Sequence, residues 1–335
     1  MRFWPYEDLP PHMTPVSVVV TSYNHARFLK ARMDTLMAQT YPDLDLWAID
    51  DCSTENNVEI LRGYEGRRGL RLVLRDRNAG LIPVMNQSIA LSTAAFLVIA
   101  QCDDECDPHL IERLMSAMRE HPTAGLAFCR SALIDERGRL LGDDFSLRER
   151  AFRARCGQDT LIRGPEMARF LLHSCVIPNM SAVVIRRRCL DAVGGTFASD
   201  YTVCVDWQFF FRVAESWDVA YVAEPLNRFR QNASTVRHRA NDRVVNEYLQ
   251  LLLPRGRQMK LSWRERCRCR TRHMYLWAAH LIPPRLKTLW LVPQQLGLVL
   301  RYDFLALLFL APAVVARIVE LAVHGVSRLF PQEAS

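Results

Sequence analysis

The sequence lacks several short motifs that would assign a function directly. None of its ten cysteines forms a Cys-x-x-Cys pair, the usual anchor of a structural zinc site. Met1–Met13 carries prolines and acids where a secretory signal peptide needs an apolar run. No internal repeat or low-complexity tract is present. We therefore expect reduced, mostly buried thiols in a protein that stays in the cytoplasm.

Glycine is missing where many nucleotide-binding folds require it. Val16–Val20 predicts a first strand, and the loop that follows it, Thr21–Asn24, contains no glycine. A dinucleotide fingerprint and a P-loop both need glycines at this point, because the backbone must approach a phosphate closely. The loop therefore argues against a dehydrogenase and a P-loop enzyme. Phosphate charge would have to be met by a metal ion and basic side chains instead.

Positive charge is concentrated in one region of the chain. The net charge is +7, but between Leu251 and Thr288 ten Lys and Arg residues face a single acid, Glu265. This stretch alone carries about +9, so the remainder is slightly acidic. The basicity is therefore a local feature and says little about the rest of the protein.

The first part of the chain alternates short β-branched runs with helical periodicity. The runs that predict strands are Val16–Val20, Leu44–Ile49, Arg71–Leu74, Phe96–Ala100 and Leu126–Phe128. The stretches that predict helices are Ala26–Gln39, Asn57–Gly63, Leu81–Leu91 and Pro108–Glu120. Asp107-Pro108 has the composition of a helix start. This alternation is typical of α/β proteins with a mainly parallel sheet and helices on both faces.

The sequence predicts four segments. An N-terminal arm, 1–14, precedes a nucleotide-binding half, 15–130, and an acceptor-binding half, 131–238. The last segment, 239–335, reads as a mostly helical extension that is first basic and then apolar.

Polar residues follow each of the first four predicted strands. They are Thr21, Ser22, Tyr23 and Asn24; Asp50 and Asp51; Arg77, Asn78 and Gly80; and Gln101, Cys102, Asp103 and Asp104. Ligands of open parallel sheets bind beyond the carboxyl ends of the strands, so these groups should converge. Any one of them could equally cap a helix or form a turn. Four such groups at one edge favour a binding site.

Asp103 and Asp104 are the most informative of these residues. Adjacent carboxylates at the end of an apolar strand are costly unless a positive charge compensates them. A hard divalent cation with oxygen ligands, shared with a diphosphate, would do so. The pair therefore predicts a site for Mg²⁺ or Mn²⁺.

Several ordered segments together resemble family 2 glycosyltransferases of the GT-A fold, over roughly Pro15 to Arg237. They are Pro15–Asn24, Gln39–Pro42, Ile49–Thr54, Asn78–Gly80 with Asn86, Cys102–Asp104, Gly194–Phe197 and Asp206–Arg212. The resemblance implies a GT-A type, Rossmann-like domain that uses a nucleotide-sugar donor.

The resemblance also implies roles for individual residues. Asp51 would hydrogen-bond the donor's base, and Asp103 would face the ribose. Asp104 would bind the metal, which Asn232 could also ligate through its carbonyl oxygen. Asp206 would be the general base of an inverting transfer. The remaining donor-binding residues would be Thr21, Ser22, Tyr23, Asn24, Arg77 and Asn78.

The implied activity is that of a hexosyltransferase-like enzyme with UDP as the first candidate nucleotide. Its acceptor would be a saccharide or a lipid-linked molecule, in the synthesis of cell-surface polysaccharide, lipopolysaccharide or glycolipid. The alternative is a non-catalytic sugar-nucleotide or polysaccharide-binding protein. Val205, in place of the acid that usually precedes the base, and Asn232, in place of a frequent histidine, favour that alternative. The four aspartates Asp51, Asp103, Asp104 and Asp206 weigh against it.

The C-terminal segment combines arginines with an apolar run. Phe304–Ala316 is thirteen residues long and contains Pro312, so we expect it not to span a bilayer. Arg317, Glu320, His324 and Arg328 mark a polar stripe on the helix that follows. Residues 251–330 therefore predict attachment to an anionic membrane surface, on the inner face. The alternatives are packing on the catalytic domain or on a second subunit. The acidic remainder of the chain disfavours nucleic acid as a partner.

Overall fold

The computed structural model describes residues 14–197, 200–232, 241–282 and 291–329, and the side chains of these except 241–242 and 322–329. It contains two compact units, Met1–Asp200 with Val205–Ala233 and Tyr201–Cys204 with Ser234–Ser335. The arm predicted for 1–14 lies outside the described residues except for Thr14, and the boundary predicted at 238/239 lies outside them as well.

The first half of the sheet is parallel, as predicted. Its strands are β1 (Val16–Ser22), β2 (Leu44–Asp50), β3 (Arg71–Leu74) and β4 (Phe96–Gln101), in the order β3-β2-β1-β4. All seven residues of β1 are buried, as are the first five of β4. A strand covered by helices on both faces needs such a continuous apolar run.

The second half of the sheet is joined to the first by an antiparallel strand. This strand, β9 (Val183–Arg186), pairs with both β4 and β6 (Ala124–Ile134). The predicted strand at Leu126–Phe128 is thus part of the longer β6. The thirteen-residue β10 (Asp218–Arg230) runs parallel to β6. The short strands are β5 (Glu105–Cys106), β7 (Leu140–Asp143) and β8 (Thr160–Ile162), and β5 pairs antiparallel with the end of β10.

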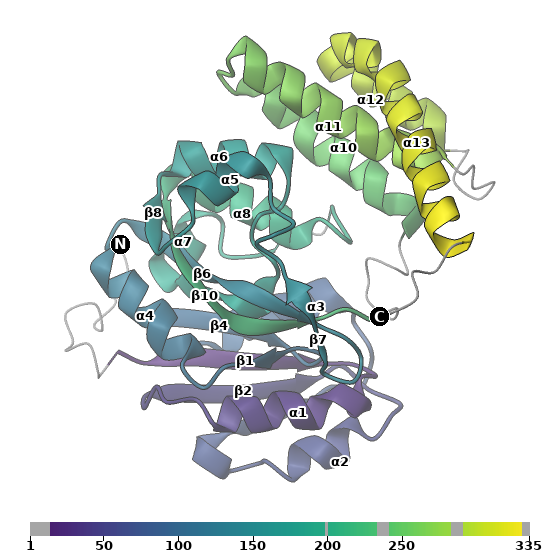
Figure 1. The fold of residues 1–335 in the computed structure, drawn as a ribbon. Helices are drawn as coiled ribbons and strands as arrows, with labels where there is room; N and C mark the ends of the chain where they lie inside the picture. Colours follow the sequence, from purple (N-terminus) through teal and green to yellow (C-terminus); the bar gives the residue numbers. More distant parts are fainter. Residues whose placement is uncertain (1–13, 198–199, 233–240, 283–290, 330–335) are drawn as a thin grey trace, which may run out of the picture. The chain divides into compact units, whose positions relative to one another are not determined.

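Helices surround this sheet on both sides (Figure 1). They are α1 (Ala26–Met37), α2 (Asn57–Arg62), α3 (Leu81–Leu91), α4 (Leu110–Glu120), α5 (Arg150–Arg155), α6 (Gly164–His173), α7 (Arg187–Ala192) and α8 (Val205–Ser216). The four helices predicted before residue 121 are all confirmed, with ends that differ by a few residues. The mixed α/β architecture predicted from the sequence is therefore confirmed.

The predicted start of α4 at Asp107-Pro108 is wrong. The helix begins at Leu110, and the Asp107 carboxylate accepts the His109 N–H at 2.9 Å in a turn before it. The Ile111 N–H in the first helical turn donates to the buried side chain of Gln39 at 3.1 Å. A residue distant in sequence thus satisfies an N–H group that a local cap was expected to satisfy.

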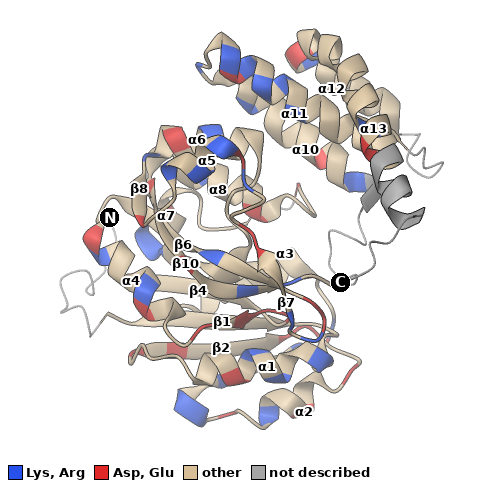
Figure 2. Cartoon of the chain, viewed as in Figure 1, with Lys and Arg blue, Asp and Glu red and all other residues tan. Residues whose placement is uncertain are grey.

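The second unit is helical, as predicted. It contains α10 (Asn241–Gln258), α11 (Trp263–Leu281), α12 (Val292–Asp303), a 3₁₀ stretch η5 (Phe304–Phe309) and α13 (Leu310–Leu329). It has its own apolar core, built from residues that include Leu253, Trp277 and Ala313. Figure 2 shows the arginines along α11, whereas α12 carries few charges.

Two polar contacts hold this unit together. The Arg270 guanidinium in α11 lies 2.7 Å from the carboxylate of Asp303 at the end of α12. The buried Glu247 carboxylate in α10 accepts the backbone N–H groups of Thr202, Val203 and Cys204 at 3.0, 2.7 and 3.0 Å. These three bonds place Tyr201–Cys204 with the helical unit.

The apolar region of the tail is longer than predicted. The segment Val292–Leu321 has 30 residues and contains an 18-residue window with a mean hydropathy of 2.2, so it is long and apolar enough to cross a membrane by length and composition alone. The thirteen-residue run Phe304–Ala316, expected not to span a bilayer, is thus part of a longer apolar segment. The backbone leaves helical geometry at Asp303, so the segment contains two helices joined by η5.

Candidate donor site at the sheet edge

The carboxyl ends of four neighbouring strands meet at one edge of the sheet (Figure 1). Ser22 of β1 is level with Asp50 of β2, and Asp50 is level with Leu74 of β3. On the other side Thr21 is level with Gln101 of β4. The four predicted loops therefore lie side by side, at the place where open parallel sheets bind ligands.

The loop after β1 is held by a buried polar network. The Ser22 hydroxyl donates to Asp50 at 3.2 Å and accepts from the Asn57 amide at 2.8 Å. Asp50 also accepts the hydroxyl and the N–H of Ser53, at 2.7 and 2.8 Å. Ser22 and Asp50 are almost fully buried. Ser22, predicted to line the donor pocket, thus has a structural role within this network.

The other predicted residues of this loop differ in exposure. Thr21 is buried, whereas the Tyr23 side chain is 37% exposed. The Asn24 backbone has a φ of 47°, and its side-chain oxygen accepts from the N–H and hydroxyl of Thr54 at 2.8 and 3.2 Å. Asn24 therefore fixes the loop after β2 against the loop after β1, and Tyr23 is the residue of the predicted four that is exposed to a ligand.

Asp51 fixes the loop after β3. Its buried carboxylate accepts the N–H groups of Ala79 at 3.0 Å and Gly80 at 2.8 Å. Gly80 has a φ of 88°, which a residue with a Cβ rarely adopts. The side chain of Asn78 donates to the Asp51 carbonyl at 3.3 Å. The structure thus brings Asp51 and Asn78 together.

The arginine that contacts Asp51 is Arg75, which the sequence reasoning missed. Its Nε lies 3.0 Å from the Asp51 carboxylate, whereas the predicted Arg77 side chain is exposed. Arg75 directly follows β3, so its position at a strand end was a usable signal. Arg77 is placed on the same loop, where it can meet a ligand from the solvent side.

Asp103 and Asp104 differ in their surroundings. Asp104 is 1% exposed, and its two carboxylate oxygens accept the Asn179 amide at 2.7 Å and the Arg230 N–H at 3.0 Å. Asp103 is half-buried, and its carboxylate accepts the side-chain amide of Asn232 at 3.1 Å. The structure thus brings the three predicted residues Asp103, Asp104 and Asn232 together, with Asp103 the more accessible of the two acids.

Arg230 organises the backbone around this pair. Its buried guanidinium donates to the carbonyl oxygens of Asp103 and Asp135, both at 2.7 Å, and contacts the Glu105 carboxylate. The pairing of β5 with β10 places Arg230 there, because Arg228 is level with Glu105. Sequence reasoning missed Arg230, since its partners lie more than 90 residues away in the chain.

The aspartate pair needs positive charge. Burial raises the pKa of the Asp104 carboxyl, and the adjacent Asp103 charge raises it further, against hydrogen bonds from Ser181 and Arg230 and the charge of Arg32. A divalent cation placed at the pair would offset this repulsion.

The donor atoms at the pair suit a hard cation. Within the described part of the chain no three His, Cys, Asp or Glu side chains gather as a metal-binding group. Asp103, Asp104 and Asn232 nevertheless offer carboxylate and amide oxygens in one place. Mg²⁺ in particular is often held by one or two carboxylates, with substrate phosphates and water completing its shell. The residues present therefore fit a cation that is shared with a diphosphate.

Asp206 lies in the first turn of α8. Its carboxylate accepts the Trp207 N–H at 2.7 Å, and the Trp207 indole donates to the Leu171 carbonyl at 3.0 Å. Phe209, Phe210 and Phe211 are buried behind it, so the helix is anchored in the core. Asp206 itself is half-buried and can reach solvent.

Solved structures with a similar fold are glycosyltransferases. One covers residues 1–349 of S. aureus TarS with UDP-GlcNAc; it has a TM-score of 0.60 and 15% identity over 85% of this chain and 79% of that one. Another is the mannosyltransferase PcManGT of Pyrobaculum calidifontis with GDP-Man and Mn²⁺, with a TM-score of 0.54 and 15% identity over 98% and 91% of the two chains. The fold is therefore that of a GT-A type transferase.

Sequence comparison matches the first part of the chain to one family. Residues 17–178 match the family model described as Glycosyl transferase family 2. Asp206 and Asn232 lie beyond the matched residues.

Curated relatives match over part of their length. The uncharacterized glycosyltransferase YibD of Escherichia coli is 31% identical over 105 residues, which are 31% of this chain and 30% of YibD. Chondroitin synthase of Pasteurella multocida is 22% identical over 146 residues, which are 43% of this chain and 15% of that enzyme. The matches thus span less than a third of either relative.

Substitution of Asp103 and of Asp104 by asparagine should change the free energy of unfolding to different extents. Asparagine at position 104 must turn its NH₂ group toward either the Asn179 amide or the Arg230 N–H, so one buried donor loses its acceptor. We expect Asp104→Asn to lower the free energy of unfolding by about 1–3 kcal/mol. Asp103→Asn should change it little, because an amide oxygen can still accept from Asn232. Urea unfolding of both variants checks this, and equal stabilities would contradict the geometry.

Proposed function

We propose that this protein is an inverting glycosyltransferase that moves a sugar from a nucleotide diphosphate donor to an acceptor hydroxyl. The observation that carries the proposal is the buried pair Asp103–Asp104 at the end of β4, tied to the end of β10 by Arg230. The pair lies beside the loops of Thr21–Asn24 and Asp51, where a nucleotide can bind next to its diphosphate.

UDP is the first candidate nucleotide. TarS was solved with UDP and with UDP-GlcNAc, and PcManGT with GDP-Man. In this chain Tyr23 has an exposed ring that would stack on the base, and Arg77 has an exposed charge that would face the ligand. Asp51 holds the loop of Asn78–Gly80, so it shapes the base pocket even where it does not touch the base.

Asp103, Asp104 and Asn232 would hold a Mg²⁺ or Mn²⁺ ion. Such an ion would stabilise the negative charge that develops on the departing nucleotide diphosphate. The support for this proposal is the oxygen-rich donor set of this chain and the Mn²⁺ bound by PcManGT.

Asp206 would act as the general base. A carboxylate held at the start of a helix that is anchored by three buried phenylalanines is fixed in direction. It would accept the proton of the acceptor hydroxyl while that oxygen attacks the anomeric carbon opposite the leaving diphosphate. The bond to the sugar inverts in one displacement, so no covalent enzyme intermediate is needed.

The acceptor would be a saccharide or a lipid-linked molecule of the cell surface. Chondroitin synthase among the relatives supports a polysaccharide product. The C-terminal unit supports a location at the inner face of the membrane, for the reasons that follow.

The C-terminal unit exposes an apolar surface. Exposed large apolar side chains on its consecutive elements α12, η5 and α13 include Leu300, Phe304, Leu308, Val315, Ile318 and Val319, each between 53% and 73% exposed. Exposed apolar surface of this kind marks an interaction site. The arginines of α11 belong to the same unit (Figure 2). Apolar side chains together with basic ones suit an anionic membrane surface.

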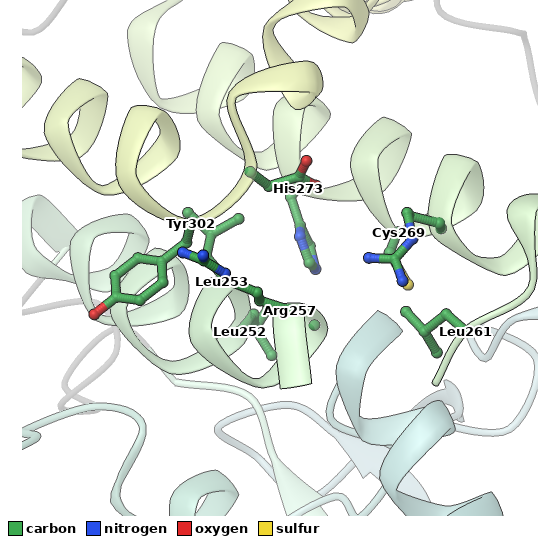
Figure 3. Close-up of a pocket in the computed structure, with 10 residues that line it drawn as sticks. Leu252, Leu253, Arg257, Leu261, Cys269, His273 and Tyr302 are labelled. Carbon is green, nitrogen blue, oxygen red and sulfur yellow. The ribbon is translucent and has the colours of Figure 1, made fainter. Parts of the chain in front are cut away.

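A small pocket in this unit is also lined by both apolar and basic side chains (Figure 3). Leucines from α10 and the loop after it meet basic and aromatic side chains from α10, α11 and α12. Its lining includes Leu252, Leu253, Arg257, Leu261, Arg266, His273 and Tyr302. A lining of this kind is compatible with a lipid head group near the surface.

Asp206→Asn tests the catalytic assignment. Asparagine keeps the size of the side chain but cannot accept the proton, so transfer should fall about 10²- to 10⁴-fold while donor affinity stays unchanged. UDP release from a panel of UDP-sugars with saccharide acceptors, and calorimetry with UDP, measure the two quantities. Glu215→Gln, an exposed acid on the same helix, is the matched control. Near-normal transfer by Asp206→Asn would contradict the assignment and direct attention to Asp200 and Glu215.

Exposed apolar substitutions test the membrane assignment. Phe304→Gln with Leu308→Gln, at residues 62% and 73% exposed, should reduce flotation with phosphatidylglycerol-containing vesicles. Leu141→Gln with Leu147→Gln, at residues 60% and 74% exposed in the other unit, is the matched control and should float like the wild type. Salt should weaken flotation, because part of the attraction is electrostatic. Equal flotation of both double variants would contradict the assignment, and resistance to alkaline extraction would make Val292–Leu321 a membrane-spanning segment.

A further inference from the structure

Asn179 is a buried polar residue in the loop between α6 and β9. It is 4% exposed, and its side-chain NH₂ donates to the Asp104 carboxylate at 2.7 Å. The backbone there is extended, with φ −167° and ψ 178°. The contact joins two segments that lie 75 residues apart in sequence.

The orientation of the Asn179 amide is determined by its two neighbours. Its NH₂ faces a carboxylate, so its oxygen must face the other way, where it accepts from the Asn227 amide at 3.2 Å. Asn227 in β10 also donates to the Ser131 hydroxyl of β6 at 2.8 Å. Turning either amide over would set oxygen against oxygen or leave a buried donor without an acceptor. Asn179 is thus fixed from the sheet side as well.

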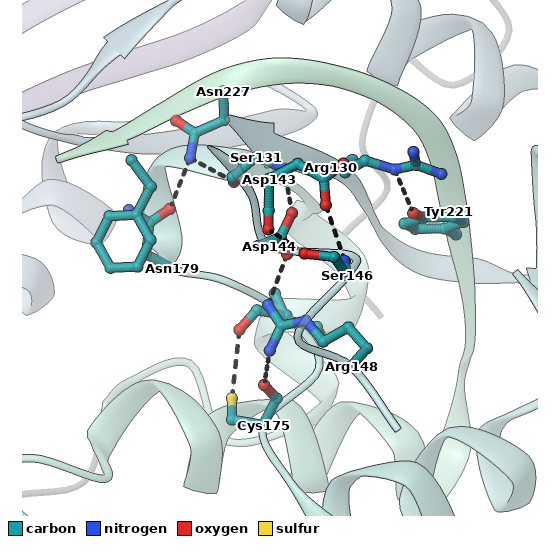
Figure 4. Close-up of polar contacts among 12 residues, drawn as sticks. Arg130, Ser131, Asp143, Asp144, Ser146, Arg148, Cys175, Asn179, Tyr221 and Asn227 are labelled. Carbon is teal, nitrogen blue, oxygen red and sulfur yellow. Dashed lines mark hydrogen bonds and ion pairs between the residues drawn. The ribbon is translucent and has the colours of Figure 1, made fainter. Parts of the chain in front are cut away.

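The same loop is held at its other end (Figure 4). The Arg148 guanidinium donates to the Cys175 carbonyl and to Asp144, both at 2.6 Å. Asp144 in turn accepts the Ser131 N–H at 2.6 Å. The polar network therefore runs from Arg148 through Asp144, Ser131 and Asn227 to Asn179 (Figure 4). From Asn179 it continues to Asp104.

We infer that Asn179 is a positioning residue for the aspartate pair: it fixes the Asp104 carboxylate and so sets how the pair presents its oxygens to a cation and a diphosphate. The inference rests on the proposed function. The Asp104 carboxylate also accepts hydrogen bonds from the backbone N–H of Arg230, which no side-chain substitution removes, and from Ser181 in the same loop as Asn179. Asn179, at 2.7 Å, is a side-chain contact through which the orientation of Asp104 can be changed.

Loss of this contact should affect the cation more than the nucleotide. Removing a partner that orients a metal ligand typically weakens metal binding 10- to 100-fold. The base pocket is built from other residues, around Asp50 and Asp51, so UDP should bind the variant as it binds the wild type when no metal is added.

The test compares two buried amides in the full-length chain. Asn179→Leu keeps the size of the side chain and removes its donor, and Asn179→Ala removes the donor without filling its space. Gln39→Leu is the matched control, because the Gln39 amide is also 4% exposed and makes structural bonds that include one to the Asp107 carbonyl at 2.7 Å and one from the Ile111 N–H. Electron paramagnetic resonance of free Mn²⁺ in the presence of UDP gives the metal affinity, and urea unfolding gives the stability.

We expect both Asn179 variants to bind Mn²⁺ about 10- to 100-fold more weakly. Gln39→Leu should lose stability to a similar degree and keep the Mn²⁺ affinity of the wild type. Wild-type affinity in either folded Asn179 variant, or an equal loss in Gln39→Leu, would overturn the inference alone. A wild-type chain that binds no Mn²⁺ with UDP would overturn the proposed function and the inference with it.

Discussion

The buried carboxylate of Asp104 sets the arrangement of the first unit. An ionised group without polar partners would cost several kcal/mol at that depth, so the fold must bring donors to it. It does so from two distant segments, the loop of Asn179 and the end of β10 at Arg230. Those contacts require the antiparallel pairing of β5 with β10 and the placement of β9 between β4 and β6. One charged side chain thus links the parallel half of the sheet to the mixed half.

The residues of the candidate site fall into two groups, buried residues that hold the backbone and exposed residues that can contact a ligand. Residues that hold the scaffold, such as Asp50 and Asp51, are buried and have their oxygens occupied by protein donors. Residues that can meet a ligand, such as Tyr23 and Asp103, lie next to them and are partly exposed. A rigid set of buried acids can therefore present a smaller set of accessible groups in fixed positions, as binding a charged ligand requires.

The sequence alone predicted the parts of the molecule that depend on local pattern. The strands from β1 to β4 are continuous runs that helices must cover, and the loops after them converge because parallel strands share one edge. It failed where a residue far along the chain decides the outcome. Gln39 replaces a local cap for α4, and Arg230 reaches Asp104 across 126 residues. Hydrogen bonds between residues that lie so far apart in sequence cannot be predicted from the spacing of apolar and polar residues.

We expect this sheet edge to bind a nucleotide diphosphate together with a divalent cation. Thermal unfolding of the wild-type chain with UDP, dTDP or GDP, each with and without Mn²⁺, tests it directly. A diphosphate at about 100 times its dissociation constant should stabilise the protein by about 2.7 kcal/mol, and the stabilisation should largely require the metal. No stabilisation by any of the three, or the same stabilisation without Mn²⁺, would contradict the account.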